Sequence, residues 1–289
     1  MLEENTRNTG ILGLLIQRVV TIFAAVAVVL LILSLGCADR LARHMLFYPR
    51  TFTHELRGET FREVWFLNSN GERLHGVFFP YQDINPHGTP VGTILYIHGN
   101  AGDVSQMLGW ADQMRSQFQC NVLIFSYAGY GKSEGRPTAP GILDDGLAAL
   151  TFLNEQEGIP TDHIIVWGLS LGGAVAVDLA SNHEVKALIV ESSFTSLADM
   201  GRVVIPFLPA RLLLWEQLSS IDKIGNVRSP VFISHGRSDR TIPFSQGQRL
   251  FEAANEPKTF FIPPPGYDHH SARHSQEHRD ALREFFDSL

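Results

Sequence analysis

Residues 164–177 read IIVWGLSLGGAVAV, and this stretch decides the fold. An apolar run typical of a buried strand ends at Ser170, and a segment with helical periodicity begins two residues later. Gly168, Ser170 and Gly172 form the pattern G-x-S-x-G, which carries a nucleophile when a strand precedes it and a helix follows it. The glycines leave the space that side chains would fill at such a sharp turn. The stretch therefore predicts that Ser170 is a candidate nucleophile.

The chain around this stretch alternates short apolar runs with amphipathic segments, which is typical of βα units on a mainly parallel sheet. Eight strands are predicted at 63–67, 73–80, 92–98, 121–127, 164–169, 187–191, 230–235 and 259–263. Five helices are predicted at 104–118, 140–154, 172–182, 245–254 and about 272–286. The first two strands are expected to form an antiparallel pair. Because ligand sites of such sheets lie at the carboxyl ends of the strands, functional residues are expected just after each strand.

Two further reactive side chains follow the last two predicted strands. Asp239 comes after the strand at 230–235, and the adjacent His269 and His270 come after the final strand. A serine hydroxyl needs a base, and the base needs a carboxylate that orients it. The order serine, aspartate, histidine therefore predicts a catalytic triad in which the choice between the two histidines is open.

The composition excludes several other classes of protein. The chain has 289 residues with 44% hydrophobic and 18% charged residues, which suits one large domain or two small ones. A net charge of -7 without a long basic run argues against nucleic acid as a partner. Cys37 and Cys120 are too few for a disulfide framework. His270, His274 and His278 share one helical face but lack further ligands, so a solvated face is expected and neither a metal nor a cofactor is predicted.

Residues 1–45 are predicted to be a separate membrane segment, followed by a catalytic domain over 46–289. Within the segment, 19–36 reads VVTIFAAVAVVLLILSLG and carries no charge. As a helix this run would span about 27 Å, close to the thickness of a bilayer core. We expect an uncleaved single-pass anchor, and arginines on both sides leave the orientation open. The alternative is a bacterial lipoprotein acylated at Cys37, since Leu-Gly-Cys resembles a lipoprotein cleavage box.

Six motifs make the chain similar to the α/β-hydrolase-fold serine hydrolases. LFYP, HGNAGD, YAGYGKSEG, GLSLGG, HGRSDRTIPF and GYDHH occur in this order. The resemblance is greatest to a small, membrane-anchored branch that includes fatty-acyl thioesterases acting on lipidated proteins. It implies an α/β-hydrolase fold with an eight-stranded, mainly parallel sheet, flanking helices and a short helical lid. It also implies that His269 is the base and that the backbone N–H groups of Asn100 and Leu171 form the oxyanion hole.

The predicted lid, at about 197–222, is the main indication of the substrate. It contains the apolar segment GRVVIPFLPARLLLWEQL, from which we expect substrate contacts by Val204, Phe207, Leu208, Leu212 and Trp215. A short apolar lid beside a membrane anchor favours an acyl chain or a lipid-like substrate. The alternative is that these side chains pack onto the core. Asp103 and Asp268 depart from the family pattern, and they would raise the pKa of an adjacent histidine if they point inward.

These residues predict a cofactor-independent serine hydrolase that cleaves a carboxylic ester or thioester of a hydrophobic acyl group through an acyl-enzyme. The expected partners are a small-molecule or lipidated acyl substrate and the membrane, and the oligomeric state is not predicted. One alternative is an aminopeptidase or amidase that uses the same triad. The other is a non-catalytic, membrane-tethered binding protein.

Overall fold

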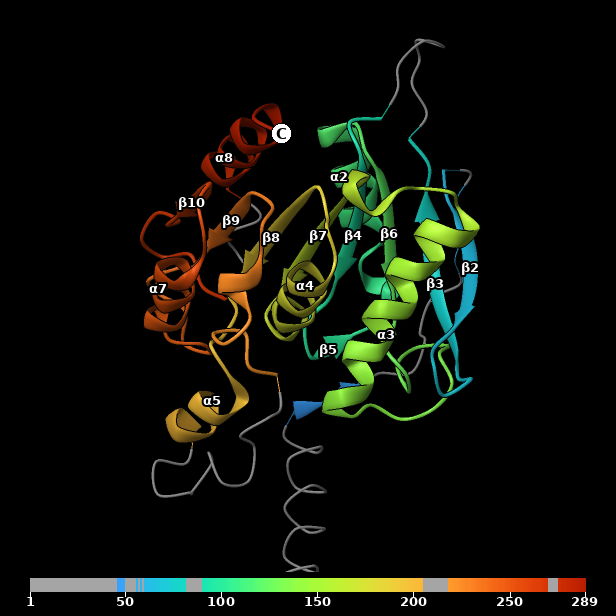
Figure 1. Ribbon diagram of the computed structural model, residues 1–289, viewed down its shortest axis with the longest axis horizontal. Helices are drawn as coiled ribbons and strands as arrows, with labels where there is room; N and C mark the ends of the chain where they lie inside the picture. The colour runs from blue at the N-terminus through green and yellow to red at the C-terminus, as the bar shows by residue number, and fades with distance from the viewer. Residues whose placement is uncertain are drawn as a thin grey trace, which may run out of the picture. The chain divides into compact units, whose positions relative to one another are not determined.

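One eight-stranded sheet organises the residues that the computed structural model describes, which are 46–49, 56, 58, 60–81, 90–204, 218–269 and 275–289. The strand order is β10-β9-β8-β7-β4-β6-β3-β2 (Figure 1). The strands are β2 (Arg62–Leu67), β3 (Arg73–Phe79), β4 (Thr93–Ile97), β6 (Asn121–Phe125), β7 (Ile164–Leu169), β8 (Ala187–Glu191), β9 (Val231–Ser234) and β10 (Lys258–Phe261). Each predicted strand is confirmed to within two residues at each end.

The sheet is mainly parallel, as the sequence predicts. The six strands from β10 to β6 in this order run parallel to one another. β3 pairs antiparallel with β6, and β2 pairs antiparallel with β3. Every residue of β4, β7 and β8 is buried. Strands covered on both faces need near-continuous apolar side chains, which explains runs such as IIVWGL and ALIVE.

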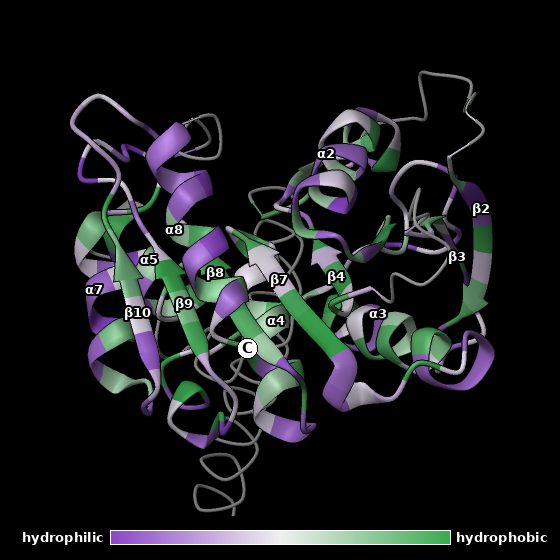
Figure 2. Ribbon diagram, turned by 90° about the horizontal axis from the view of Figure 1, so that it is seen from above, coloured by the Kyte–Doolittle hydropathy of each residue, from purple (hydrophilic) through white to green (hydrophobic). Residues whose placement is uncertain are grey.

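Helices cover both faces of this sheet. α2 (Leu108–Phe118) and α8 (Gln276–Asp287) lie on one face, and α3 (Ala139–Thr151) and α4 (Leu171–Asn182) lie on the other (Figure 2). Two shorter helices, α5 (Leu197–Val204) and α7 (Phe244–Ala253), follow β8 and β9. The remaining helical turns are η1 (Val104–Gln106), η2 (Phe152–Gln156), η3 (Thr161–His163) and η4 (Ile224–Asn226).

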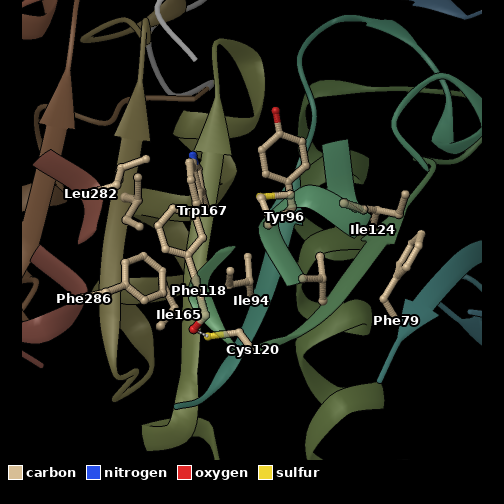
Figure 3. Packing of buried hydrophobic residues seen from close by; sticks show 14 of the residues in the cluster. Phe79, Ile94, Tyr96, Phe118, Cys120, Ile124, Ile165, Trp167, Leu282 and Phe286 are labelled. Atoms are coloured by element: carbon tan, nitrogen blue, oxygen red, sulfur yellow. Dashed lines mark hydrogen bonds between the residues drawn. The ribbon is translucent and has the colours of Figure 1, made fainter. Parts of the chain in front are cut away.

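Aromatic side chains fill the layer between the sheet and the α2–α8 pair. Phe118 of α2 stacks on Phe286 of α8 with ring centroids 4.3 Å apart (Figure 3). Trp167 of β7 is fully buried, and its ring lies 5.9 Å from Phe118 and 6.1 Å from Tyr96 of β4. This packing holds β7, the strand that directly precedes Ser170, in the middle of the sheet.

A small second sheet lies beside the main one and is not anticipated by the sequence pattern. β1 (Tyr48–Pro49) pairs parallel with β5 (Ala101–Gly102). The N–H of Tyr48 also donates a hydrogen bond to the carbonyl of Asn100 at 3.0 Å. The pair therefore fastens the loop that follows β4.

Two predicted segments fall largely outside the described residues. The predicted hydrophobic helix at 19–36 is one of them, and among the residues described no helix is long and apolar enough to cross a membrane. The other is the apolar part of the lid, with Phe207, Leu208, Leu212 and Trp215. Of the lid, the structure describes α5, which ends at Val204, and the residues from 218 onward.

Candidate active site

The turn between β7 and α4 holds Ser170 in a backbone conformation that side chains rarely adopt. Its φ is 55° and its ψ is -116°. The N–H of Ser170 donates to the carbonyl of Glu191 at 2.8 Å, which ties the turn to the end of β8. A Cβ at Gly172 would lie 2.1 Å from the carbonyl oxygen of Ile97, and one at Gly168 would lie 2.2 Å from that of Gly172. The G-x-S-x-G pattern is therefore a steric requirement of this turn.

Ser170, His269 and Asp239 meet at the carboxyl ends of the strands. Nε2 of His269 lies 3.0 Å from Oγ of Ser170, and Nδ1 lies 2.7 Å from Oδ2 of Asp239. All three residues are buried, with exposed fractions of 6–8%. Because a carboxylate only accepts, Nδ1 carries the ring hydrogen, and Nε2 is then the atom that can accept the serine proton. The geometry is that of a nucleophile, a base and an orienting acid.

The carboxylate of Asp239 is stabilised in its charged form. Burial raises its pKa, but hydrogen bonds involving His235, His269 and the N–H of Ile242 outweigh burial and hold the pKa well below the usual range. Oδ1 accepts from the N–H groups of Thr241 and Ile242 at 2.8 and 2.9 Å. Asp239 is therefore ionised at neutral pH and can stabilise an imidazolium on His269.

The loop after β4 passes directly beside the nucleophile. A Cβ built on Gly99 would lie 3.4 Å from Cβ and 3.9 Å from Oγ of Ser170. The next residue is Asn100, and Leu171 is the first residue of α4. Backbone N–H groups at the start of a helix favour negative charge. The loop that carries one predicted oxyanion donor, Asn100, therefore passes beside Ser170, and the other, Leu171, is the next residue along the chain.

Comparison with known proteins identifies the fold family. The family model described as alpha/beta hydrolase fold matches residues 92–212. An uncharacterized protein of Mycobacterium tuberculosis is 37% identical over 225 residues, 78% of each chain. The alpha/beta hydrolase domain-containing protein WAV2 of Arabidopsis thaliana is 34% identical over 229 residues, 72% of each chain. The chain belongs to the α/β-hydrolase family. The Pyrococcus furiosus esterase Pf2001 shares the fold, with a TM-score of 0.68 and 17% identity over 83% of this chain and 98% of that one.

In this α/β-hydrolase, the two aspartates that depart from the expected pattern differ in their surroundings. Asp103 is fully buried and caps η1, where its Oδ1 accepts from the N–H and the hydroxyl of Ser105 at 2.7 and 2.5 Å. Its charge raises the pKa of His98, but burial dominates and lowers that pKa to about 4. Asp268 is exposed, next to His269. Asp103 therefore acts on the pKa of His98 in the expected direction, but burial has the larger effect.

The prediction that the histidines of the last helix form a solvated face is wrong at His278, the one member that the structure describes. His278 is fully buried on α8, and its Nε2 lies 2.7 Å from Oε1 of Glu191. Oε2 of Glu191 accepts from Nε1 of Trp167 at 2.8 Å. His278 faces the sheet because the apolar face of α8 packs on it. His270 and His274 lie outside the described residues.

Sequence reasoning misses two buried residues next to Ser170 and Asp239 in this α/β-hydrolase. Glu191 is the last residue of β8, and a carboxylate at the carboxyl end of a strand is a signal that could have identified it. His235 follows β9, and its Nε2 lies 3.0 Å from the carbonyl of Ile242 and 3.4 Å from Oδ2 of Asp239. Within the described parts of the chain, no group of three or more histidine, cysteine or acidic side chains could hold a metal.

Proposed function

We propose that this α/β-hydrolase is a serine hydrolase that cleaves carboxylic esters or thioesters. The supporting observation is the continuous line from Oγ of Ser170 through His269 to Asp239, with separations of 3.0 and 2.7 Å. These distances lie within hydrogen-bond range, so a proton can pass from the serine to the imidazole without rearrangement.

In the proposed reaction, Oγ of Ser170 attacks the acyl carbon while Nε2 of His269 takes the hydroxyl proton. The carbonyl oxygen becomes an oxyanion that accepts from the N–H groups of Asn100 and Leu171. The carbon–oxygen or carbon–sulfur bond then breaks, and His269 returns the proton to the leaving alcohol or thiol. A water molecule, deprotonated by His269, attacks the acyl-enzyme and releases the carboxylic acid and free Ser170. Asp239 remains ionised and stabilises the imidazolium in both halves of the reaction.

The proposed substrate carries a hydrophobic acyl chain. This rests on the apolar composition of the lid at about 197–222 and on the uncharged run at 19–36, which would bring the enzyme to a bilayer as a single-pass anchor. We therefore favour an acyl ester or thioester of a lipid or a lipidated protein. The structural neighbour from Pyrococcus furiosus is an esterase, which agrees with ester chemistry.

The test is the Ser170→Ala variant of the full chain, assayed in detergent with 4-nitrophenyl esters of increasing acyl length and with matched acyl thioesters. We expect loss of hydrolysis and loss of labelling by a fluorophosphonate probe. Ser181→Ala, a substitution near the end of α4, is the matched control and keeps both activities. Wild-type activity in Ser170→Ala would overturn the proposal. Cleavage of aminoacyl amides but not of esters would indicate a peptidase, and a wild-type protein that reacts with no probe would indicate a binding protein.

A further inference from the structure

Side chains hold three consecutive carbonyl groups of the loop beside Ser170. The hydroxyl of Tyr127 donates to the carbonyl of His98 at 2.7 Å, and Nδ1 of His98 donates to the carbonyl of Gly99 at 2.7 Å. The hydroxyl of Tyr130 donates to the carbonyl of Asn100 at 2.9 Å. We propose that Tyr127 and Tyr130, acting with His98, are positioning residues that aim the N–H of Asn100 at the reacting carbonyl. This inference rests on the proposed serine hydrolase function.

Peptide planarity connects these carbonyl contacts to the direction of the N–H groups. A trans peptide is flat, so its N–H points away from its own C=O. The carbonyl of Gly99 and the N–H of Asn100 belong to one peptide, and the ring of His98 fixes that carbonyl. Tyr127 and Tyr130 fix the peptides on either side. The Asn100 N–H therefore cannot turn without breaking at least one of three hydrogen bonds.

Both tyrosines are suited to act as permanent donors. Tyr127 and Tyr130 are fully buried, and burial raises the pKa of both phenols, so each keeps its proton at neutral pH. Their rings also pack against the imidazole of His98, with centroids 4.4 and 5.5 Å away, and against each other at 5.7 Å. The Tyr127 contact is buried, and a hydrogen bond in such low-dielectric surroundings is stronger than one in water.

The turn that carries the tyrosines is itself anchored. The N–H of Ala128, between them, donates to Oδ2 of Asp145 on α3 at 2.8 Å. Gly129 and Gly131 adopt φ values of 77° and 56°, which let the chain reverse so that both hydroxyls face the loop. The supporting role of its two tyrosines explains the motif YAGYG, which the sequence analysis uses only as part of the family resemblance.

The supported loop is in contact with the nucleophile turn, so a shift in one affects the other. A Cβ at Gly172 would lie 2.6 Å from the carbonyl oxygen of His98, the same carbonyl to which Tyr127 donates. Oxyanion donors act through preorganisation, because they stabilise charge that develops only in the transition state. Loss of a positioning bond should therefore lower kcat and leave KM almost unchanged.

The test is Tyr127→Phe, Tyr130→Phe and the double variant of the full chain, with the best ester found for the wild type. We expect kcat to fall about tenfold for each single variant and about a hundredfold for the double variant. For comparison, removal of a complete oxyanion donor lowers kcat by about a hundredfold or more. KM should change less than twofold. The affinity for a boronic acid, which mimics the tetrahedral intermediate, should fall in parallel with kcat.

Ile142→Val, a truncation of a fully buried residue on α3, is the control for a general loss of stability. At a matched decrease in Tm it should keep wild-type kcat and boronic acid affinity. Wild-type kcat and boronic acid affinity in the double tyrosine variant, or an equal loss in Ile142→Val, would overturn the inference. An active Ser170→Ala variant would instead overturn the proposed function. The two failures are therefore distinguishable.

Discussion

Oδ2 of Asp239 lies 2.7 Å from Nδ1 of His269, although the two residues stand 30 positions apart on loops after different strands. Asp239→Asn keeps the shape of this contact but replaces an acceptor with an amide that can turn an N–H toward Nδ1. The ring would then carry its hydrogen on Nε2 and be unable to accept the proton of Ser170. We expect kcat to fall on the order of a thousandfold or more. Ester hydrolysis at pH 8 measures the loss.

Asp268→Asn is the matched control, since Asp268 is an exposed aspartate one residue before His269. It should retain activity within about threefold, because exposed charges interact weakly through water. An Asp239→Asn variant as active as Asp268→Asn would remove Asp239 from the mechanism.

Substitution of the two adjacent histidines tests which of them is the base. His269 lies within hydrogen-bond distance of both Ser170 and Asp239, so we expect His269→Gln to abolish hydrolysis. If His269 is the base, as proposed, His270→Gln should retain it. Fluorophosphonate labelling rates provide the same comparison without a substrate, since the probe also needs an activated serine. Labelling of His269→Gln at the wild-type rate would contradict this assignment.

Position 172 must be glycine because the backbone at the end of β4 leaves no room for a side chain there. Gly172→Ala would put a methyl group 2.1 Å from the carbonyl oxygen of Ile97, where only backbone movement gives relief. We expect a loss of about 2 kcal/mol or more in the free energy of unfolding. Gly109→Ala on α2 is the control, because its Cβ would meet nothing within 4 Å and should stabilise the helix by about 0.5–1 kcal/mol. Urea denaturation measures both, and equal effects would contradict the steric argument.

Asp145 makes stability depend on pH. Burial raises its pKa to about 6, although hydrogen bonds from Asn68 and the N–H of Ala128 act in the opposite direction. The folded state therefore binds more protons than the unfolded state between the ordinary aspartate pKa and about 6, so this contribution to stability is lost as pH rises through that window.

Asp145→Asn removes this titration. Relative to the wild type, the variant should gain up to about 3 kcal/mol in the free energy of unfolding between pH 4 and pH 7, since one pKa unit is worth about 1.36 kcal/mol. Urea denaturation at a series of pH values measures the difference. Asp144→Asn, which removes a neighbouring charge that also raises the pKa of Asp145, should reduce the pH dependence only in part. Parallel curves for Asp145→Asn and the wild type would refute the prediction.

The sequence predicts the sheet well because the physical signal is local. Strands buried on both faces must be apolar along their whole length, and Ile164–Leu169 and Ala187–Glu191 show this directly. The pair β1–β5 has two residues in each strand, too few for any periodicity to appear. The sequence analysis does not predict α5 as a separate helix but includes it in the lid, because its apolar residues continue without a break into the apolar segment that follows.

The sequence predicts the part of the candidate site whose residues come directly after strands. Ser170, Asp239 and His269 each follow a strand, so topology brings them to one edge of the sheet. The supporting residues were not predictable in this way. Tyr127 contacts the backbone of His98, 29 positions earlier, and His278 contacts Glu191 across the sheet. Such contacts depend on side-chain orientation, which no period in the sequence encodes.

Glu191 joins three elements around the nucleophile. Its carbonyl accepts from the N–H of Ser170, while its carboxylate accepts from Nε1 of Trp167 and lies 2.7 Å from Nε2 of His278. Glu191→Ala would leave two buried ring nitrogens without this partner, and removal of one member of a buried polar group costs about 2–5 kcal/mol. Because the backbone carbonyl of Glu191 still accepts from Ser170 in this variant, we expect the free energy of unfolding to fall while kcat of the folded fraction changes less than in Asp239→Asn.

Glu184→Ala is the control. This exposed position lies just before β8, and its substitution should alter the free energy of unfolding by less than about 0.5 kcal/mol. Equal urea midpoints for Glu191→Ala and Glu184→Ala would mean that the carboxylate of Glu191 does not hold β7 and α8 together.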